Sequence, residues 1–344
     1  MTRVRSSRWV RLACASSVLV LMGAACSPTV DPPLLGSAPS PTAGSVPAFS
    51  HVVVVTLENT NYDEVFGPGG AAAAPYMNSL ADQWALATQY YGVGHASLTN
   101  YIAMTSGQTP RQVTEIDCPL YDCSYPTTVG NIADQVEASG RTWKGYMDGM
   151  PTACAHGAAG SIDPYFAYLP PFNTYATRHN PFMYYDSIVG NPSRCVAHDV
   201  PYSQLATDLA ANQLPDLSFI SPDLCNDGHE DQCGVHAADN WLSVELPKIL
   251  GNAQFQAGGV VFVTFDEAEQ SDGSGCCGDT TGGGRVGTIV ISPTHGATGG
   301  FRSATPHNHY SLLRTIEDAW HLDLLGHAQD ASITPMTEFF PNWP

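Results

Sequence analysis

Two short runs of apolar, mostly β-branched residues constrain the fold of this chain more than any other feature. They span residues 51–57 (HVVVVTL) and 259–265 (GVVFVTF). Neither run alternates between apolar and polar residues, and such unbroken runs are typical of strands buried on both faces of a sheet. A sheet with two buried faces needs helices on each side, as in parallel sheets built from strand–helix–strand units.

Weaker strand patterns and helical patterns alternate along the rest of the chain. Further strands are predicted at 142–147, 217–221 and 288–292. Helices are predicted at 74–83, 97–105, 129–138, 202–212, 237–250 and 311–320. This alternation predicts an α/β fold with a mostly parallel central sheet and helices on both faces.

The N-terminus has the layout of a targeting segment. Four arginines come first: Arg3, Arg5, Arg8 and Arg11. An apolar stretch at 13–25 follows and is too short for a comfortable membrane span, as in a secretory signal peptide. Residues 21–26 (LMGAAC) are similar to a bacterial lipobox, in which the cysteine, here Cys26, is lipidated after cleavage. We therefore predict an exported cell-surface lipoprotein with a signal peptide at 1–26, and simple secretion is the alternative.

Residues 27–49 are rich in Pro, Ser, Ala and Gly and are predicted to form a flexible linker to a globular domain at 50–344. Removing the four arginines from the 13 basic residues, against 32 acidic ones, leaves a formal charge of −23. Such a surface repels nucleic acid and anionic lipid headgroups. We expect no nucleic-acid partner, and contact with a membrane only through the N-terminal lipid anchor.

The cysteines predict disulfides. Eight of the ten cysteines follow Cys26, and an even number in an oxidising compartment favours pairing. Neighbours along the sequence suggest the pairs Cys118–Cys123, Cys154–Cys195 and Cys225–Cys233. Cys276 and Cys277 then form a vicinal bridge or stay reduced. A zinc–thiolate site is disfavoured because paired C-x-x-C spacing is absent from the sequence.

Acidic residues follow both apolar runs directly. Glu58 comes after the first run, and Asp266 and Glu267 come after the second. Ligands of open α/β sheets bind beyond the carboxyl ends of the strands, where these three carboxylates would repel one another without a cation. Their oxygen atoms suit Mg²⁺, Ca²⁺ or Mn²⁺. The alternative is that each acid caps a helix or pairs with an arginine.

Ser97 lies at the start of a helical pattern within residues 94–107 (GHASLTNYIAMTSG). A serine in this place can simply be a helix N-cap. The same place also suits a nucleophile, because a helix N-terminus favours phosphate and a nearby metal activates a hydroxyl. Loop histidines such as His229 and His309 are candidates for metal ligands or general acids.

Six stretches together resemble the bacterial and fungal phosphoesterase family of acid phosphatases and phospholipases C, within the alkaline phosphatase superfamily. They are HVVVVTLENTNYDEVFG (51–67), GHASLTNYIAMTSG (94–107), RHNPF (178–182), SFISPDLCNDGHE (218–230), FVTFDEAE (262–269) and HYSLLRTIEDAWHL (309–322). They occur in order along the body of the chain. The resemblance implies an alkaline-phosphatase-like fold and a phosphoesterase catalytic domain at 50–344.

The resemblance also implies three groups of site residues. A divalent ion (Ca, Mg, Mn or Zn) would be held by Glu58, Asp266 and Glu267, with Asp223 matching a second-site ligand of relatives. Catalysis would use Ser97 as the nucleophile and the histidines His95 and His309. The phosphate would be bound by Asn59, Asn100 and His229.

Two departures from the family pattern refine this expectation. Asn226 stands where many members have histidine, and Glu267 stands where alkaline phosphatases have histidine, which favours one tightly held metal, or a second that is only weakly held, over a full two-metal site. The body is shorter than the phospholipases C, which usually carry extra C-terminal domains. We therefore expect an acid-phosphatase-like phosphomonoesterase acting through a phosphoserine on small phosphate esters.

Other functions stay open. A phospholipase C or phosphodiesterase would use the same site on phospholipids or diesters. A non-catalytic Ca²⁺-binding lipoprotein would have the same fold but no catalytic activity. A sulfatase is disfavoured because Ser97 is not followed by a C-x-P-x-R type of sequence.

Overall fold

The computed structural model describes residues 46–166 and 174–341. The predicted signal peptide, Cys26 and most of the predicted linker lie outside these residues. Val46 and Phe49, which fall within the predicted linker, are buried in the hydrophobic core. Within the described ranges, none of the helices combines the length and the apolar character that crossing a bilayer requires.

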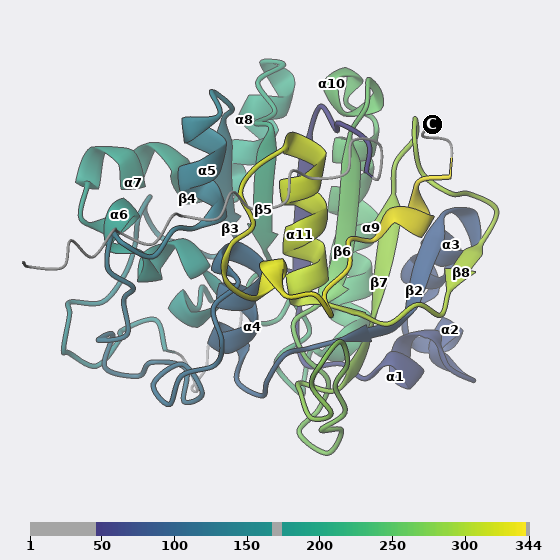
Figure 1. The fold of residues 1–344 in the computed structure, drawn as a ribbon, viewed down its shortest axis with the longest axis horizontal. Coiled ribbons are helices and arrows are strands. Elements are labelled where there is room, and N and C mark those ends of the chain that lie inside the picture. Colours follow the sequence, from purple (N-terminus) through teal and green to yellow (C-terminus); the bar gives the residue numbers. More distant parts are fainter. Residues whose placement is uncertain (1–45, 167–173, 342–344) are drawn as a thin grey trace, which may run out of the picture. The chain divides into compact units, whose positions relative to one another are not determined.

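A nine-stranded sheet forms the centre of the fold (Figure 1). Across the sheet the strands are β4 (Asp199–Pro201), β3 (Trp143–Met147), β5 (Leu217–Ser221), β1 (Val52–Leu57), β6 (Val260–Phe265), β7 (Arg285–Ile291), β2 (Ala85–Tyr91) and β8 (Phe301–Ser303), and β9 (His307–Asn308) pairs with β2. All neighbours are parallel except β7, which is antiparallel to both β6 and β2. The prediction of a mostly parallel sheet is confirmed.

The two apolar runs are neighbours at the centre of this sheet. Every residue of β1 and β6 is buried. Val52 pairs with Val260 and Leu57 with Phe265, so the strands run in parallel and end level with each other. The acids that follow the two strands therefore start from adjacent points at one edge of the sheet.

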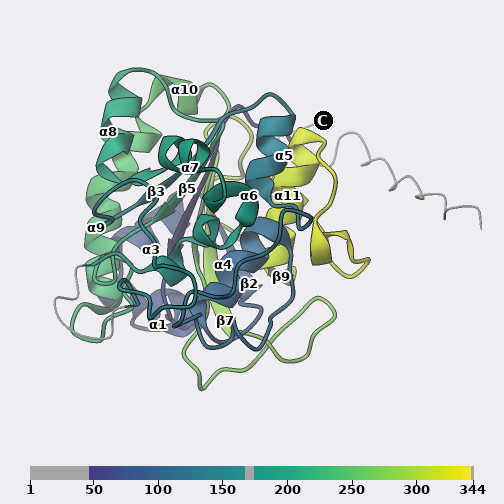
Figure 2. The same cartoon turned by 90° about the vertical axis from the view of Figure 1, so that its left-hand side faces the viewer.

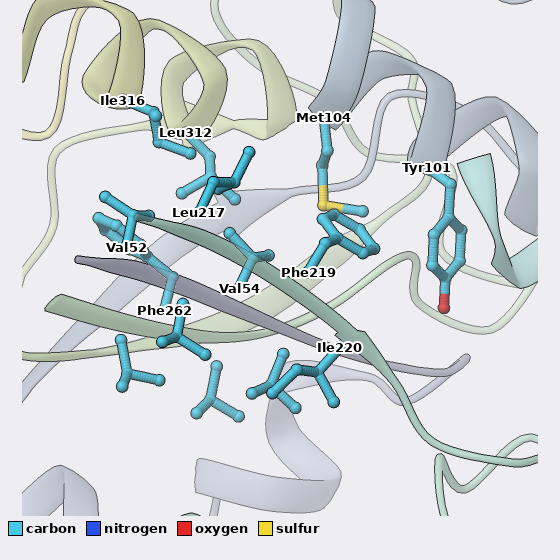
Figure 3. Close-up of a cluster of buried hydrophobic side chains, with 14 of the residues drawn as sticks. Val52, Val54, Tyr101, Met104, Leu217, Phe219, Ile220, Phe262, Leu312 and Ile316 are labelled. Atoms are coloured by element: carbon cyan, nitrogen blue, oxygen red, sulfur yellow. The ribbon is translucent and has the colours of Figure 1, made fainter. Parts of the chain in front are cut away.

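Helices cover both faces of the sheet, as predicted, and Figure 2 shows the sheet between the two layers. One layer contains α3 (Pro75–Gln83), α8 (Ser203–Ala210) and α9 (Gly234–Leu250). The other contains α4 (Ser97–Ser106), α5 (Ile132–Ala138) and α11 (His309–Trp320). Figure 3 shows how α4 and α11 pack on the sheet through Met104, Leu312 and Ile316.

Shorter elements complete the fold. They are α1 (Tyr62–Phe66), α2 (Gly70–Ala73), α6 (Asp186–Val189), α7 (Pro192–His198), α10 (Ala253–Gln256) and 3-10 turns at Thr177–His179, Pro181–Tyr184, Gly326–Gln329 and Thr337–Phe339. The helix predicted from residue 129 begins at Ile132, because the Asn131 side chain accepts the Asp134 N–H and caps it there. The strand predicted from residue 288 begins at Arg285.

The three disulfides predicted from sequence neighbours are confirmed. Cys118–Cys123, Cys154–Cys195 and Cys225–Cys233 are bonded. Of the two alternatives for Cys276 and Cys277, the structure has the vicinal bridge. This bridge lies in the glycine-rich loop between β6 and β7, which extends beyond the edge of the sheet in Figures 1 and 2.

Candidate active site

Four acidic side chains converge beyond the carboxyl ends of β1, β5 and β6. Glu58, Asp227 and Asp266 are fully buried, and Glu267 is nearly so. The Glu58 N–H donates to the Asp227 carbonyl oxygen at 2.9 Å, which joins the loop after β5 to the end of β1. Burial and then the nearby acids raise the pKa of Glu58 and of Asp266 well above the usual carboxyl range. The repulsion between these buried carboxylates must be relieved, either by protons on some of them or by a bound cation.

The surroundings of this cluster fit a divalent metal ion. Glu58, His179 and His229 each offer one ligand atom, and these three atoms lie within 4.8 Å of one another. Among the described residues, Asp266 Oδ2 and His179 Nε2 are buried without a hydrogen-bond partner. Buried polar atoms without partners are costly, and metal coordination would satisfy them. The oxygen and imidazole atoms together suit Mg²⁺, Mn²⁺, Ca²⁺ or Zn²⁺.

Ser97 is brought directly to this cluster. It is the first residue of α4 and Ala96 occupies the N-cap position, so the N-cap alternative does not describe Ser97. Its Oγ donates to Glu58 Oε2 at 2.8 Å. Ala96 before it has a φ of 107°, a value that L-residues rarely adopt, and its N–H donates to Glu267 Oε2 at 2.9 Å. Strain of this kind is typical of residues that position a functional group.

Asn59 lies between the acids at the strand ends. Its backbone N–H donates to Asp266 Oδ1 at 3.2 Å. With its amide nitrogen turned toward the acids, its side chain donates to Glu58 Oε2 and Asp266 Oδ1, each at 3.2 Å. Asn59 also lines the cavity above Ser97, where the sequence predicted a phosphate contact.

Asn100 is placed differently from the phosphate-binding residue that was predicted. Its side chain is fully buried. Oδ1 accepts the Val93 N–H at 2.8 Å, and Nδ2 donates to the Gly94 carbonyl at 2.8 Å and to Glu267 Oε2 at 3.4 Å. These bonds fix the loop that precedes Ser97, and they favour a positioning role over direct contact with phosphate.

The three predicted site histidines occupy three different environments. His95 lines the cavity, with Nδ1 3.2 Å from Glu267 Oε2, and the hydrogen bond with Glu267 raises the pKa of His95. His229 also lines the cavity, but burial lowers its pKa to about 3. His309 is fully buried, between the Tyr90 hydroxyl and the Asp266 carbonyl, and burial lowers its pKa to about 4. His309 therefore supports the end of β6, whereas His95 faces the place where a substrate would lie.

Asp223 turns toward its own loop. Its Oδ1 accepts the N–H groups of Cys225 at 3.0 Å and Asn226 at 2.8 Å. Asp227, four residues later, is the acid of this loop that reaches the Glu58 cluster, through its contact with His179 at 3.0 Å. This geometry favours a structural role for Asp223 over the second-site ligand that was predicted.

Three residues of the site were not singled out from the sequence. Asp227 lies in the stretch SFISPDLCNDGHE and His179 in RHNPF. Both stretches resemble the family, but the resemblance did not suggest a role for either residue. Tyr101 donates to Glu58 Oε1 at 2.5 Å and stacks on the His179 ring, with ring centroids 5.5 Å apart. Tyr101 lies four residues after Ser97, so the two side chains share one helix face, and this spacing could have predicted that Tyr101 reaches the site.

A cavity of about 420 Å³ opens above Ser97. It is lined by Asn59, His95, Ala96, Ser97, Glu115, Ile116, Asp117, His229, Glu267 and Gln270. Local positive charge comes from the buried Arg178, whose guanidinium lies 3.3 Å from His229 and 4.0 Å from Asp117, and the hydrogen bond with Glu267 favours the protonated form of His95. The volume and this charge suit a small phosphate ester.

Comparison with known proteins places the chain in a family. The model of the Phosphoesterase family matches residues 70–323. A probable acid phosphatase of Kluyveromyces lactis is 30% identical over 292 residues, which are 83% of this chain and 62% of the relative. A phosphatidylinositol-3-phosphatase of Mycobacterium tuberculosis is 26% identical over 302 residues, which are 87% of this chain and 85% of the relative.

The fold has neighbours among solved structures. A protein of the alkaline phosphatase superfamily from Vibrio parahaemolyticus aligns with a TM-score of 0.56 and 13% identity, over 85% of this chain and 70% of that one. The chain spans less than two thirds of the length of the acid phosphatases of Kluyveromyces lactis and Aspergillus fumigatus. The family match nevertheless runs from α2 to the residues just after α11 and includes Ser97 and both acids that follow β6. This chain therefore belongs to the phosphoesterase family and has the fold of the alkaline phosphatase superfamily.

Proposed function

We propose that this protein is an exported, metal-dependent phosphomonoesterase of the acid-phosphatase type, with Ser97 as its nucleophile. The observation that carries the proposal is the 2.8 Å hydrogen bond from Ser97 Oγ to Glu58 Oε2 at the floor of the cavity. Acid phosphatases are among the most similar relatives, which supports a phosphoric ester as the substrate.

Glu58, Asp266 and Glu267 are the proposed metal ligands, with His179 and Asp227 close by. A divalent ion, when bound, would lower the pKa of the serine hydroxyl and offset the charge of the phosphoryl oxygens. The net charge of −19 makes local positive charge a requirement for any site that accepts phosphate.

The protein residues then have defined tasks. Ser97 Oγ attacks phosphorus in line as its proton passes to Glu58, and the bond from phosphorus to the ester oxygen breaks. Asn59 lines the cavity, and its amide would turn from Glu58 and Asp266 to donate hydrogen bonds to the equatorial oxygens of the transferring group. His95 gives its proton to the leaving alkoxide, because it lines the cavity while His309 does not. Water then attacks the phosphoserine from the vacated side and passes a proton to His95, the bond from phosphorus to Ser97 Oγ breaks, and Ser97 takes back the proton held by Glu58.

Export is supported by the order of arginines, apolar residues and small residues before Cys26. The four disulfides also suit an oxidising compartment. A lipid on Cys26 would hold the enzyme at the cell surface, and a free N-terminus would release it. Mass spectrometry of the native protein distinguishes the two, since only the first predicts a lipidated Cys26.

A parallel assay tests the reaction type and the metal together. The substrates are p-nitrophenyl phosphate, its bis-ester and phosphatidylcholine, each with intact enzyme and with enzyme dialysed against EDTA. We expect the monoester to be preferred, activity to be lost on dialysis, and one of Ca²⁺, Mg²⁺, Mn²⁺ or Zn²⁺ to restore it. Preference for the bis-ester or for phosphatidylcholine would assign the site to a phosphodiesterase or phospholipase C instead.

A further inference from the structure

The cavity above Ser97 opens onto exposed apolar side chains. Ile116 lines the cavity and is nevertheless 59% exposed. Seven large apolar side chains are exposed among the described residues, and four of them lie on the segments 113–120 and 162. They are Val113, Ile116, Leu120 and Ile162, which we call the apolar rim. Isolated apolar residues on a surface are ordinary, but this concentration beside a cavity indicates a ligand.

The two segments of the apolar rim are held together. The Asp163 N–H donates to the Pro119 carbonyl at 2.9 Å, and this bond brings together the backbone beside Ile162, which precedes Asp163, and Leu120, which follows Pro119. The Cys118–Cys123 disulfide closes the short loop that carries Leu120. The exposed side chains of both segments therefore belong to one region of the surface.

The loop that carries Ile116 is fixed in place. The Asp117 carboxylate accepts the N–H of Leu98 in the first turn of α4 at 3.0 Å. The guanidinium of Arg111 stacks on the Tyr125 ring, 3.8 Å from its centroid. Because these contacts hold both ends of the loop, Ile116 stays at the mouth of the cavity and its apolar surface faces the solvent there.

The charges around Ile116 limit what can cover it. Its neighbours Glu115 and Asp117 both line the cavity. The Arg178 guanidinium lies 4.0 Å from Asp117 and offsets part of its charge, whereas Glu115 adds a second carboxylate beside the entrance. This pair of carboxylates disfavours a leaving group that carries a second phosphate or another anion. An uncharged, apolar leaving group meets no such repulsion and gains from covering Ile116.

We propose that the site takes phosphomonoesters whose leaving group is an alkyl or acyl chain, and that Ile116 and Leu120 bind this chain. The inference rests on the proposed phosphomonoesterase and names its substrate class. Because Ile116 and Ser97 share one cavity, the group that covers Ile116 during turnover is the group esterified to the phosphate.

A series of n-alkyl phosphates with two to eight carbons, assayed below their micelle concentrations, tests this substrate class. For the native enzyme, kcat/KM should rise with chain length by up to about fourfold per methylene, the limit set by full burial of one CH₂. Hexyl phosphate should also be preferred over the same chain ending in a second phosphate. A kcat/KM that does not depend on chain length would overturn the inference.

Two variants test whether the dependence on chain length arises at Ile116. Ile116→Ser should lower the ratio of kcat/KM for octyl over ethyl phosphate by about tenfold, equivalent to losing the burial of one to two methylenes. Val244→Ser changes a side chain with the same 59% exposure on α9, away from the cavity lining, and should leave the ratio unchanged. An equal ratio in native enzyme and Ile116→Ser would overturn the assignment to the apolar rim. Failure to hydrolyse any monoester, p-nitrophenyl phosphate included, would contradict the phosphomonoesterase itself and the inference with it.

Discussion

Within residues 46–166 and 174–341, two serines each begin a helix, and one of them bonds to an acid. Ser97 opens α4 and bonds to Glu58, whereas Ser203 opens α8 and is exposed. Ser97→Ala should abolish turnover and change the free energy of unfolding by about 1–3 kcal/mol at most, the effect of removing one donor from a buried acceptor. Ser203→Ala is the matched control and should keep full activity. Rapid quench with a labelled monoester should place phosphate on the peptide that contains Ser97.

Substantial activity in the Ser97→Ala variant would contradict the role of Ser97 as the nucleophile. If Ser97→Ala keeps more than about a hundredth of the native rate, beyond what a lost nucleophile permits, direct attack by water describes the reaction better. Ser97→Thr keeps a hydroxyl in the same place and should retain part of the activity.

His95 should act on the leaving group rather than on phosphorus. His95→Gln should lower kcat by about 10²–10⁴ for alkyl phosphates, whose alkoxides need a proton as they depart. The loss should be much smaller for p-nitrophenyl phosphate, because p-nitrophenolate is stable without one. Equal losses for both substrates would assign His95 a role in binding or positioning instead.

The buried acids give the metal-free protein a characteristic pH dependence. Burial raises the pKa of Glu58, Asp227 and Asp266 in the folded state, so these groups bind protons more tightly there than in the unfolded chain. Their contribution to stability is present below the ordinary carboxyl range and is lost as the pH rises through the raised values. The Tm of EDTA-treated protein should therefore fall between pH 5 and pH 8, and added metal should raise it more at pH 8 than at pH 5. A metal-induced shift that is larger at pH 5 would contradict this account.

At the scale of elements, the loop at 93–96 depends on one buried amide from the helix that follows it. Asn100→Ala would leave the Val93 N–H and the Gly94 carbonyl without their partner. We expect a loss of about 1–3 kcal/mol in the free energy of unfolding together with a large fall in kcat, since Ser97 loses its support. Asn131→Ala removes the N-cap of α5, costs about 0.5–2 kcal/mol and should leave kcat unchanged. A stable Asn100→Ala variant with the native kcat would remove Asn100 from the machinery.

The sequence alone predicted the elements whose pattern is local. β1 and β6 are unbroken apolar runs, and their parallel pairing placed Glu58 beside Asp266 as expected. β2 was missed because Thr88 and Gln89 interrupt its apolar pattern, and β8 and β9 are too short to show one. His179 was missed because its contact with Glu58 depends on the path of 3-10 turns between α5 and α6, which no local pattern determines.

At the scale of the whole molecule, the charge of −19 opposes every anionic substrate before it reaches the cavity. Raising the ionic strength from about 0.01 M to 0.15 M shortens the Debye length from about 30 Å to 8 Å and weakens this repulsion. For p-nitrophenyl phosphate, kcat/KM should therefore increase with salt over this range. Its singly charged bis-ester should show a weaker dependence, and a decrease with salt would mean that local positive charge controls the encounter.

One turn of the chain has a consequence for how such enzymes can diverge. β7 runs antiparallel to β6, so the segment between them leaves the sheet after Asp266 and returns beside its starting point at Arg285. A connection that begins and ends on adjacent strands needs no crossover helix, and residues can be added to it or removed without moving a single strand. Natural selection can therefore reshape the loop beside His95 while the acids that follow β6 stay in place, and differences in substrate preference among related chains should concentrate in this connection.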